Sequence, residues 1–452
     1  MKRLIATWWP LAASWLLMGL ELPAVSAVIA RLDDPEINLA AYGGVVFALA
    51  LLVEAPIIMM LAASTALSKN RDAYWKLYRF MMVLAGTLTV VHLLIAFTPL
   101  YYVVVERLIG APEPVVEAAR PGLMIMLPWT WFIAYRRFNQ GALIRFGHSN
   151  AVGIGTIIRL SVTMTTLTIG LVSERFPGIV IGPAAVIAGV VSEAIYAGLR
   201  IRPVLRNEIP EMPAGSEPLT YRAIADFYIP LALTSLIFLI AQPILSASMS
   251  RMPLAIPSLA VWGVLSGLVF LFRSAGIAFL EVVVALLDEP GSSGPILRFS
   301  WVLAGAITLG MALIAFTPLS GLWFGAISGL SPDLVEFGKI GLILALLWPL
   351  TNVFQSLFQG AILYSRKTRA VTEAVVIFLT TATAVNIAGV RIGEVPGIYI
   401  GVCAVVLGSI VQTLWLFHRA RPTLRQVIER DRLVLNPRAE GEKRDLSRAI
   451  DP

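Results

Sequence analysis

The sequence contains one long internal repeat. The heptapeptide LIAFTPL occurs at residues 94–100 and again at residues 313–319, which lie 219 residues further along the chain. Near the start of each half the separation is 220, which aligns Pro23 with Pro243. Below, two residues related in this way are called repeat partners. The repeat predicts two units of like fold, and its other partners include Arg31 and Arg251, Trp129 and Trp348, Pro177 and Pro396, and the Gln-Gly-Ala triplets at 140–142 and 359–361.

The composition places both units in a lipid bilayer. Hydrophobic residues make up 58% of the chain and charged residues only 14%, with a mean hydropathy of +0.81. A soluble core of this size could not hide so much apolar surface. The single cysteine, Cys403, and three scattered histidines provide no disulfide framework and no cluster of metal ligands. We therefore expect no metal and no cofactor, apart from a coupling proton or sodium ion.

Apolar segments of about 20 residues, the length that crosses a hydrocarbon layer of roughly 30 Å, occur six times in each half. They predict an all-α integral membrane protein with about twelve transmembrane helices in two six-helix bundles related by a pseudo-two-fold axis. The expected parts are a first lobe at 1–203, a linker at 204–222, a second lobe at 223–422 and a polar tail at 423–452. The segments lie near residues 8–30, 40–67, 77–104, 121–145, 150–173, 178–199, 225–250, 258–287, 299–321, 336–364, 370–391 and 396–418.

The charges in the connecting segments predict the orientation. Lys and Arg collect after the even-numbered spans, whereas Asp and Glu collect after several odd-numbered ones. Because positive loops stay in the cytoplasm, both termini are expected there, in the inner (plasma) membrane, and the chain is expected to be a monomer. The same rule accounts for the net charge of +7 without a nucleic-acid partner. Residues 424–430 are expected to form a short helix on the membrane surface, and the chain from Asn436 onward to be disordered.

Two membrane-embedded acids are candidates for ion coupling. An ionisable side chain in the bilayer is costly unless it faces a partner or a cavity, so it is a functional candidate by default. Glu21 lies in the middle of the first span, two residues before Pro23, which can bend the helix. The alternative for Glu21 is a hydrogen bond to a neighbouring helix. Glu281, in the eighth span, is the second candidate.

Opposite charges at one pair of repeat partners suggest a gate. Glu54 in the second span is the repeat partner of Arg273, and a pair that forms in one state and breaks in another could open and close a pathway. The alternative is that each residue is satisfied separately. For Glu193, whose repeat partner is Gln412, we expect a hydrogen bond that packs two helices.

Arginines of the first lobe are candidates for binding the cargo. Arg136, Arg137 and Gln140 lie in the fourth span, and Arg159 lies well inside the fifth. Because arginine suits carboxylate and phosphate groups, these four residues predict a site for an anion. The alternative for Arg136 and Arg137 is that they extend to the lipid headgroups.

Several motifs resemble a known transporter superfamily. A proline in the first helix of each half, Gln-Gly-Ala closing the fourth and tenth spans, and Pro-Gly opening the sixth and twelfth are similar to the multidrug/oligosaccharidyl-lipid/polysaccharide (MOP) exporters. That superfamily includes the multidrug and toxic compound extrusion (MATE) antiporters. Within it, the chain resembles the progressive ankylosis (ANK) type, on the segments Trp9-Pro10-Leu11, Ala41-Tyr42-Gly43, Leu94-Ile95-Ala96 and Leu280-Glu281.

The resemblance implies a V-shaped pair of bundles, alternating access, and export coupled to a proton or sodium gradient. In MATE relatives an acidic residue carries the ion, and Glu21 and Glu281 are the positions here that match. ANK-type relatives are associated with export of pyrophosphate, nucleotides or citrate. The expected function is therefore secondary active export of a small organic or phosphorylated anion.

Three other functions are weighed against it. A MATE-type antiporter for lipophilic cations and a flippase for lipid-linked sugars are the alternatives within the superfamily. An enzyme is not expected, because the sequence presents no nucleophile with its base, no metal set and no phosphate-binding loop.

Overall fold

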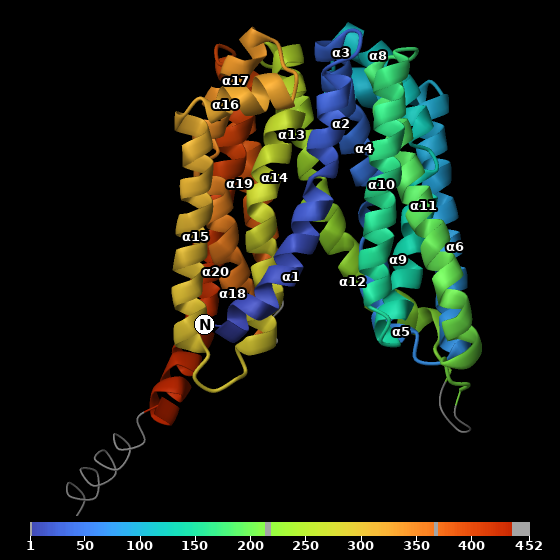
Figure 1. Cartoon of the computed structure of the whole chain (residues 1–452), viewed down its shortest axis with the longest axis vertical. Helices are drawn as coiled ribbons and strands as arrows, with labels where there is room; N and C mark the ends of the chain where they lie inside the picture. Colours follow the sequence, from blue (N-terminus) through green and yellow to red (C-terminus); the bar gives the residue numbers. More distant parts are fainter. Residues whose placement is uncertain (1, 213–217, 366–368, 436–452) are drawn as a thin grey trace, which may run out of the picture.

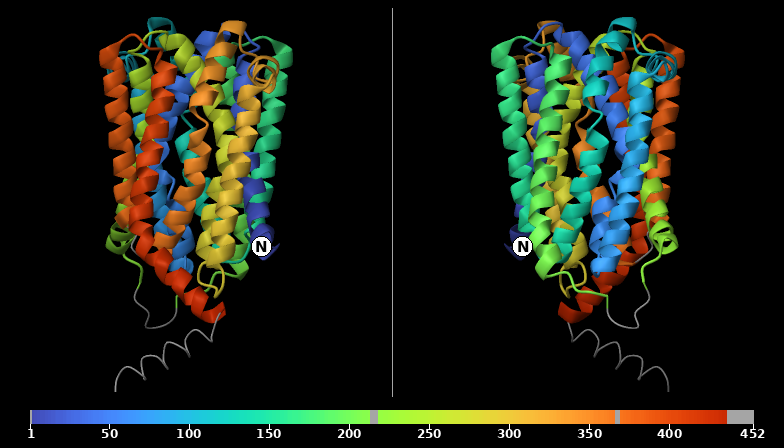
Figure 2. Two further views of the ribbon diagram at one scale, coloured as in Figure 1. Left: turned by 90° about the vertical axis from the view of Figure 1, so that its left-hand side faces the viewer. Right: turned by 90° about the vertical axis from the view of Figure 1, so that its right-hand side faces the viewer.

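The computed structural model describes residues 2–212, 218–365 and 369–435, and within these ranges it contains helices and no strands. Figure 1 shows two lobes that approach each other at the top of the view and diverge toward the bottom. Figure 2 shows the helices of both lobes running roughly side by side between two layers of loops. The all-helical, two-lobed architecture that the repeat predicts is confirmed.

The first half of the chain forms the first lobe and contains three irregular turns of π- or 3-10 helix, marked η. Its elements are α1 (Lys2–Gly19), α2 (Glu21–Ile29), α3 (Pro35–Leu39), η1 (Ala40–Val46), α4 (Phe47–Glu54), η2 (Ala55–Ile57), α5 (Met60–Leu67), α6 (Arg71–Phe97), α7 (Leu100–Tyr102), η3 (Val103–Ile109), α8 (Glu113–Ile125), α9 (Trp129–Arg145), α10 (Asn150–Ser173) and α11 (Gly178–Asn207).

The second half repeats this order with fewer interruptions. Its elements are α12 (Tyr221–Leu239), α13 (Ala241–Met249), α14 (Ala255–Leu286), α15 (Ser293–Phe316), α16 (Leu319–Gly321), η4 (Leu322–Ile327), α17 (Pro332–Leu344), α18 (Leu347–Tyr364), α19 (Arg369–Ile392) and α20 (Gly397–Leu435).

The local breaks in the helices follow the repeat. The first helix of each half breaks at a pair of repeat partners, Leu20 and Ile240. The π-helices η3 and η4 also correspond, and the glycines that follow them, Gly110 and Gly329, both have a φ of 73°. The main exception is α14, which is continuous where the first half breaks at η2. Pro56 lies inside η2, whereas its repeat partner is Ala275, which keeps the amide hydrogen that a helix needs.

One expected span is less apolar than the others. Eleven helical segments of the described chain are long and apolar enough to cross a membrane. The segment of α8 and α9, which corresponds to the expected fourth span, is not among them, because Arg136 and Arg137 lower its hydropathy. Its counterpart in the second half, Pro332–Tyr364, does qualify. The fourth span is therefore the polar member of the bundle.

The two lobes are joined at the end opposite the Lys- and Arg-rich loops. Arg31 of the first lobe donates hydrogen bonds to the carbonyl oxygens of Ala326 (2.5 Å) and Ile327 (2.8 Å) at the end of η4. Its repeat partner Arg251 donates to those of Leu108 (2.7 Å) and Ile109 (2.6 Å) at the end of η3. We call these two reciprocal sets of contacts the arginine clasps.

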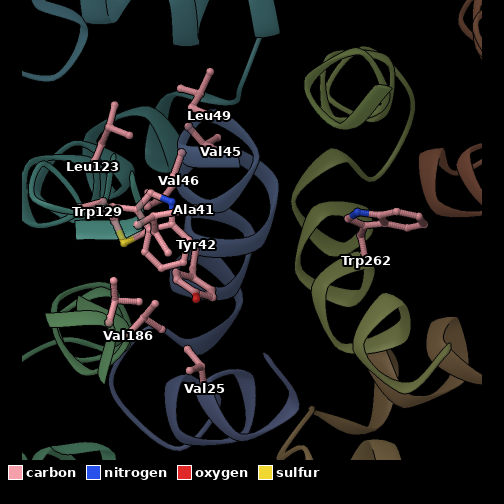
Figure 3. Close-up of a cluster of buried hydrophobic side chains, with 14 of the residues drawn as sticks. Val25, Ala41, Tyr42, Val45, Val46, Leu49, Leu123, Trp129, Val186 and Trp262 are labelled. Carbon is pink, nitrogen blue, oxygen red and sulfur yellow. The ribbon is translucent and has the colours of Figure 1, made fainter. Parts of the chain in front are cut away.

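An apolar core continues between the lobes below the clasps. Figure 3 shows part of it, with Tyr42, Val45, Trp129 and Val186 grouped in the first lobe, and Trp262 on α14 pointing away from them into the second lobe. Tyr42, Val45 and Val186 are at most 2% exposed. The same buried cluster includes residues of both halves, such as Val45 and Leu259.

The first helix of each half crosses to the opposite lobe at the basic end. In Figure 1, α1 runs from the centre toward the second lobe and α12 toward the first. The indole of Trp8 in α1 donates a hydrogen bond to the carbonyl of Ala275 (2.9 Å). The phenol ring of Tyr228 in α12 packs edge-on against Phe80 of α6, with 5.3 Å between ring centroids. Residues 2–19 therefore pack on the second lobe although they belong to the first half.

The end of α20 corrects one expectation. We expected a separate helix on the membrane surface at 424–430, but α20 continues through these residues to Leu435. Val427 is 3% exposed and belongs to the core of the second lobe. Asp431 accepts a hydrogen bond from the backbone N–H of Ser293 (2.8 Å), so it fastens α20 to the start of α15. The segment from Asn436, expected to be disordered, lies outside the described residues.

Candidate functional site

Glu21 is the first residue of α2, directly after the break at Leu20. Its carboxylate faces the guanidinium of Arg159 from α10, which donates to both oxygens: Nε lies 3.0 Å from Oε1, and Nη2 contacts Oε2. Thr163, one turn further along α10, donates to Oε1 at 3.2 Å. Planar, two-point pairing of this kind is among the strongest arrangements open to an arginine.

Glu193 of α11 is the second carboxylate of the cluster and is fully buried. Arg136 Nη1 donates to its Oε2 at 2.5 Å, and Gln140 Nε2 donates to its Oε1 at 2.9 Å. Arg159 Nη1 lies 3.9 Å from the same carboxylate. Arg159 therefore stands between Glu21 and Glu193 and connects the two pairs.

The close approach of α10 and α11 depends on a glycine. A Cβ at Gly189 would lie 2.1 Å from Thr163 Oγ1 and 2.9 Å from the carbonyl oxygen of Arg159, so only a residue without a side chain fits there. This contact holds Arg159 and Thr163 against the helix that carries Glu193.

Glu54 at the end of α4 is the third buried acid. It accepts a hydrogen bond from the indole N–H of Trp129 (2.6 Å), and Arg137 Nε lies 3.9 Å away. The guanidinium of Arg159 lies over the Trp129 ring, 6.0 Å from its centroid. Three carboxylates and three guanidinium groups thus share this region, and their formal charges cancel. We call these six residues the charge cluster: Glu21, Glu54, Glu193, Arg136, Arg137 and Arg159.

A small cavity opens beside the cluster. Its volume is about 30 Å³, enough for a water molecule. A larger cavity of about 420 Å³ lies at the clasped end, between α3 and the start of α17, and takes no part in the cluster. The small cavity is lined by Met18, Glu21, Arg136, Thr156, Arg159 and Leu160.

The structure brings most of the residues singled out in the sequence into one place. Arg136, Gln140 and Arg159 lie together with Glu21, and Arg137 lies with Glu54 at the edge of the same region. Glu193 has a larger role than the packing bond expected for it, because it joins Arg136 to Arg159. Thr163 and Trp129 were not predicted as site residues, although Trp129 is marked as the repeat partner of Trp348. Their roles follow only from how the helices cross.

Two predicted groups lie elsewhere. Arg273 does not contact Glu54 in this conformation. Its guanidinium lies over the ring of Trp348, 4.7 Å from the centroid. Glu281 is exposed, five residues before the end of α14, in the second lobe and apart from the charge cluster. The gate and the coupling role of Glu281 stay predictions.

The second lobe carries an uncharged copy of one pair. Gln355 and Gln412 are the repeat partners of Arg136 and Glu193, and Gln355 Nε2 donates to Gln412 Oε1 at 3.2 Å. It also lies 3.1 Å from the carbonyl oxygen of Ser409. The contact between these two helices is therefore kept in both lobes, whereas the charge is found only in the first.

The two repeated helical lobes, clasped at one end and with a buried charge cluster at a helix break in the first lobe, have the fold of MATE transporters of the MOP superfamily. The model of the progressive ankylosis protein (ANKH) family matches residues 1–264, and the chain belongs to this family. A comparison with curated proteins finds no match.

Solved structures of MATE and MOP transporters share the fold at low identity. An inward-facing multidrug resistance MATE transporter has a TM-score of 0.68 and 16% identity, covering 91% of this chain and 96% of its own. An outward-facing one has a TM-score of 0.63 and 17% identity, covering 94% and 96%. A MOP transporter from Pyrococcus furiosus has a TM-score of 0.62 and 16% identity, covering 93% and 96%.

Proposed function

We propose that this protein is a secondary active transporter that exports a small organic or phosphorylated anion by alternating access, coupled to a proton or sodium ion that binds at Glu21. The observation that carries the proposal is the two-point contact between Glu21 and Arg159 at the break between α1 and α2. While the Glu21 carboxylate accepts two hydrogen bonds from Arg159, another anion cannot bind those same donors.

The contact couples two binding events. While Glu21 is ionised, it holds the donors of Arg159. A proton or sodium ion on Glu21 weakens that pair, and Arg159 becomes available to a carboxylate or phosphate group of the cargo. Cation loading at Glu21 and anion binding at Arg159 therefore favour each other, and the linkage is reciprocal. The two ions would then cross together, so an inward cation gradient opposes export, and the outward gradient of the anion itself must drive it. Anion binding is accordingly tighter at low pH.

The balance of charges favours an anion over a lipophilic cation. In the part of the chain that the structure describes, each of the three acids in the cluster lies within 4 Å of an arginine. A cationic drug would have to displace one of these arginines, whereas an anion needs only the release of Arg159. The Pyrococcus furiosus transporter is described as having a binding pocket of reversed polarity, which suggests a different function for it. Proteins with this fold can therefore differ in the polarity of their binding pockets.

The orientation follows from the positive loops. We place the basic end, which also carries Lys2, in the cytoplasm and the clasped end outside, with the chain in the inner (plasma) membrane. The clasps close the outer end in this conformation, so the cargo enters from the cytoplasm.

The test is transport by the purified protein in liposomes, with separate proton, sodium and null gradients, offering citrate, pyrophosphate and a cationic dye. Wild-type anion affinity is expected to rise on acidification, by at most about tenfold for each pH unit, the limit for one coupled proton. Glu21→Gln, which imitates the protonated acid, is expected to bind anions without this pH dependence.

Two further variants separate the alternatives. Glu281→Gln tests the second predicted coupling residue, and Glu106→Gln, in an exposed position at the outer end, is the control. Wild-type pH dependence in Glu21→Gln would contradict the coupling step. Transport of the dye but of neither anion would assign a drug antiporter, and movement of lipid-linked sugars would assign a flippase.

A further inference from the structure

Arg273 is a membrane-embedded cation without a counter-charge. It lies 18 residues after the start of α14 and 13 before its end. Its Nε is buried without a hydrogen-bond partner, and within the described residues no carboxylate pairs with the guanidinium. The three arginines of the charge cluster differ, because each lies within 4 Å of a glutamate oxygen.

The repeat shows that a glutamate of the first lobe is replaced by an arginine at the matching position of the second lobe. Glu54 accepts the indole N–H of Trp129, and at the repeat-partner positions Arg273 lies on the ring face of Trp348. The tryptophan is kept and the charge beside it is reversed. The other five members of the charge cluster have uncharged repeat partners, namely Ala241, Gln355, Ser356, Phe378 and Gln412. Where the cluster in the first lobe sums to zero, the matching positions of the second lobe keep one positive charge.

The surroundings of Arg273 are suited to a flat anion. Trp348 supports the guanidinium from one side and itself stacks on Trp262, with 6.1 Å between centroids and 16° between planes. Asn352, one turn after Trp348, is buried, and its Oδ1 has no hydrogen-bond partner. That oxygen lies 2.7 Å from the Cβ position of Gly276, which is three residues after Arg273 and so near the same face of α14. Because an amide oxygen only accepts hydrogen bonds, an anion at this place would bind through the donors of Arg273 and not through Asn352 Oδ1.

An embedded charge of this kind calls for compensation. Arg273 is only partly buried, so water and the ring of Trp348 each offset part of the cost of a membrane-embedded ion without a counter-charge. We propose that Arg273, held flat by Trp348, is the residue that binds the carboxylate or phosphate group of the cargo in the second lobe. Guanidinium binds both groups through two parallel hydrogen bonds. This assignment rests on the proposed function.

In this proposal the two lobes have different roles in binding the anion. The charge cluster of the first lobe makes transport depend on a cation, through Glu21 and Arg159. Arg273 selects for negative charge at all pH values, because no acid in the described chain competes for it. An anion located between the lobes would thus meet Arg273, which is always free to bind it, and Arg159, which is free only when Glu21 carries a cation.

The experiment measures binding of citrate and pyrophosphate by titration calorimetry, to the purified full chain in discs of uncharged phosphatidylcholine. Arg273→Gln is expected to weaken binding by about 10- to 100-fold, the loss of a charge-assisted contact. Arg273→Lys keeps the charge without the planar fork and is expected to recover part of that affinity. Arg298→Gln, an exposed arginine of α15 in the same lobe, is expected to bind as the wild type does.

Each result decides a different point. If the wild type binds neither anion, the proposed function fails. If the wild type binds and Arg273→Gln binds equally well, the function stands and the role of Arg273 is overturned. Discs that contain anionic lipid test whether Arg273 binds a lipid headgroup instead of the cargo. If anionic lipid competes with the anions, if only Arg273→Gln abolishes this competition, and if the affinity for the cargo is unchanged, Arg273 is a headgroup site and the proposal is overturned. If Arg273→Gln does not fold, equal affinity in Arg273→Lys and the wild type overturns it.

Discussion

At the scale of single residues, the charges of the charge cluster are paired with one another. Arg136 and Glu193 form the most deeply buried pair, with side chains 6% and 1% exposed. Such a pair contributes little net stability, but an ion left without its partner is strongly destabilising. In the second lobe, the uncharged pair Gln355 and Gln412 makes a hydrogen bond at the matching positions.

The repeat therefore predicts which substitutions the first lobe tolerates. Arg136→Gln and Glu193→Gln are each expected to destabilise the protein by about 3 to 5 kcal/mol, because each leaves one buried charge unpaired. The double variant, which imitates the pair in the second lobe, is expected to recover most of this loss. Thermal unfolding in detergent measures all three. A double variant less stable than both single ones would show that the pair is not the unit of stability.

The residues of this site could be predicted from the sequence, but their pairing could not. Glu21, Arg136 and Arg159 stand out because an ionisable side chain in an apolar span needs a reason to be there. Which acid meets which arginine depends on how α2, α10 and α11 cross, and no local pattern encodes those crossings. Glu193 was assigned a packing bond for that reason.

At the scale of helices, close contact between α5 and α9 positions the polar side of the fourth span. Ser64 donates to the carbonyl of Phe138 (2.7 Å), and Thr65 donates to that of Gly141 (3.1 Å). A Cβ at Gly141 would lie 2.4 Å from the carbonyl oxygen of Leu61 and 2.7 Å from Ser64 Cβ. Small residues that let two backbones approach are typical of helix packing in membranes.

Gly141→Ala is therefore expected to lower the thermal stability and to reduce transport, because α9 also carries Arg136 and Arg137. Overpacking of this kind costs about 1 to 3 kcal/mol. Gly153→Ala in α10 is the matched control, since nothing lies within 4 Å of its Cβ position. It is expected to leave the melting temperature unchanged or slightly raised, as alanine favours a helix. Equal melting temperatures for the two variants would argue against a tight seam.

Most helix positions were predictable from the sequence, as were the breaks close to Pro23 and Pro56, whereas the π-helices were not. Apolar length reports where a span lies but not whether its hydrogen bonds run regularly. The π-helices η3 and η4 lie at or just after the ends of the apolar segments predicted at 77–104 and 299–321, where the sequence predicts no helix. Pro56 breaks its span and Ala275 does not, a difference visible only when repeat partners are compared. The run at 424–430 was misjudged because a helix of this composition can pack on protein as well as on lipid.

At the scale of the whole molecule, the arginine clasps close one end of the two lobes, which we propose to be the outer end. Arg31 and Arg251 each bind carbonyl groups at the end of a π-helix in the other lobe. Gly110 and Gly329 leave room for them: a Cβ at Gly110 would lie 3.1 Å from the guanidinium carbon of Arg251, and one at Gly329 would lie 3.2 Å from Arg31 Nη1. Alternating access requires these contacts to break when the outer end opens.

Arg31→Ala together with Arg251→Ala is expected to shift the population toward an open outer end, because contacts specific to the closed state are lost. A cysteine at Leu330, which is 7% exposed in the wall of the 420 Å³ cavity, reports opening in a Cys403→Ser background. Its reaction with a membrane-impermeant thiol reagent is expected to speed up by about tenfold or more, since hydrogen bonds to charged groups contribute roughly 1.5 to 3 kcal/mol.

Arg175→Ala, an exposed arginine at the same end, serves as the control and is expected to leave the rate of labelling unchanged. Equal rates in the clasp variant and the control would show that the apolar core alone keeps the outer end shut.

The breaks at Leu20 and Ile240 have a mechanical consequence. Below each break the helix is fastened to the opposite lobe. Trp8 of α1 donates a hydrogen bond to Ala275 of α14, and Tyr228 of α12 packs on Phe80 of α6. When the lobes move relative to each other, these two helices must bend at Leu20 and Ile240 rather than slide. Glu21 is the first residue past one of these flexing points, so the pivot of the motion and the group that loads the ion are neighbours in the chain.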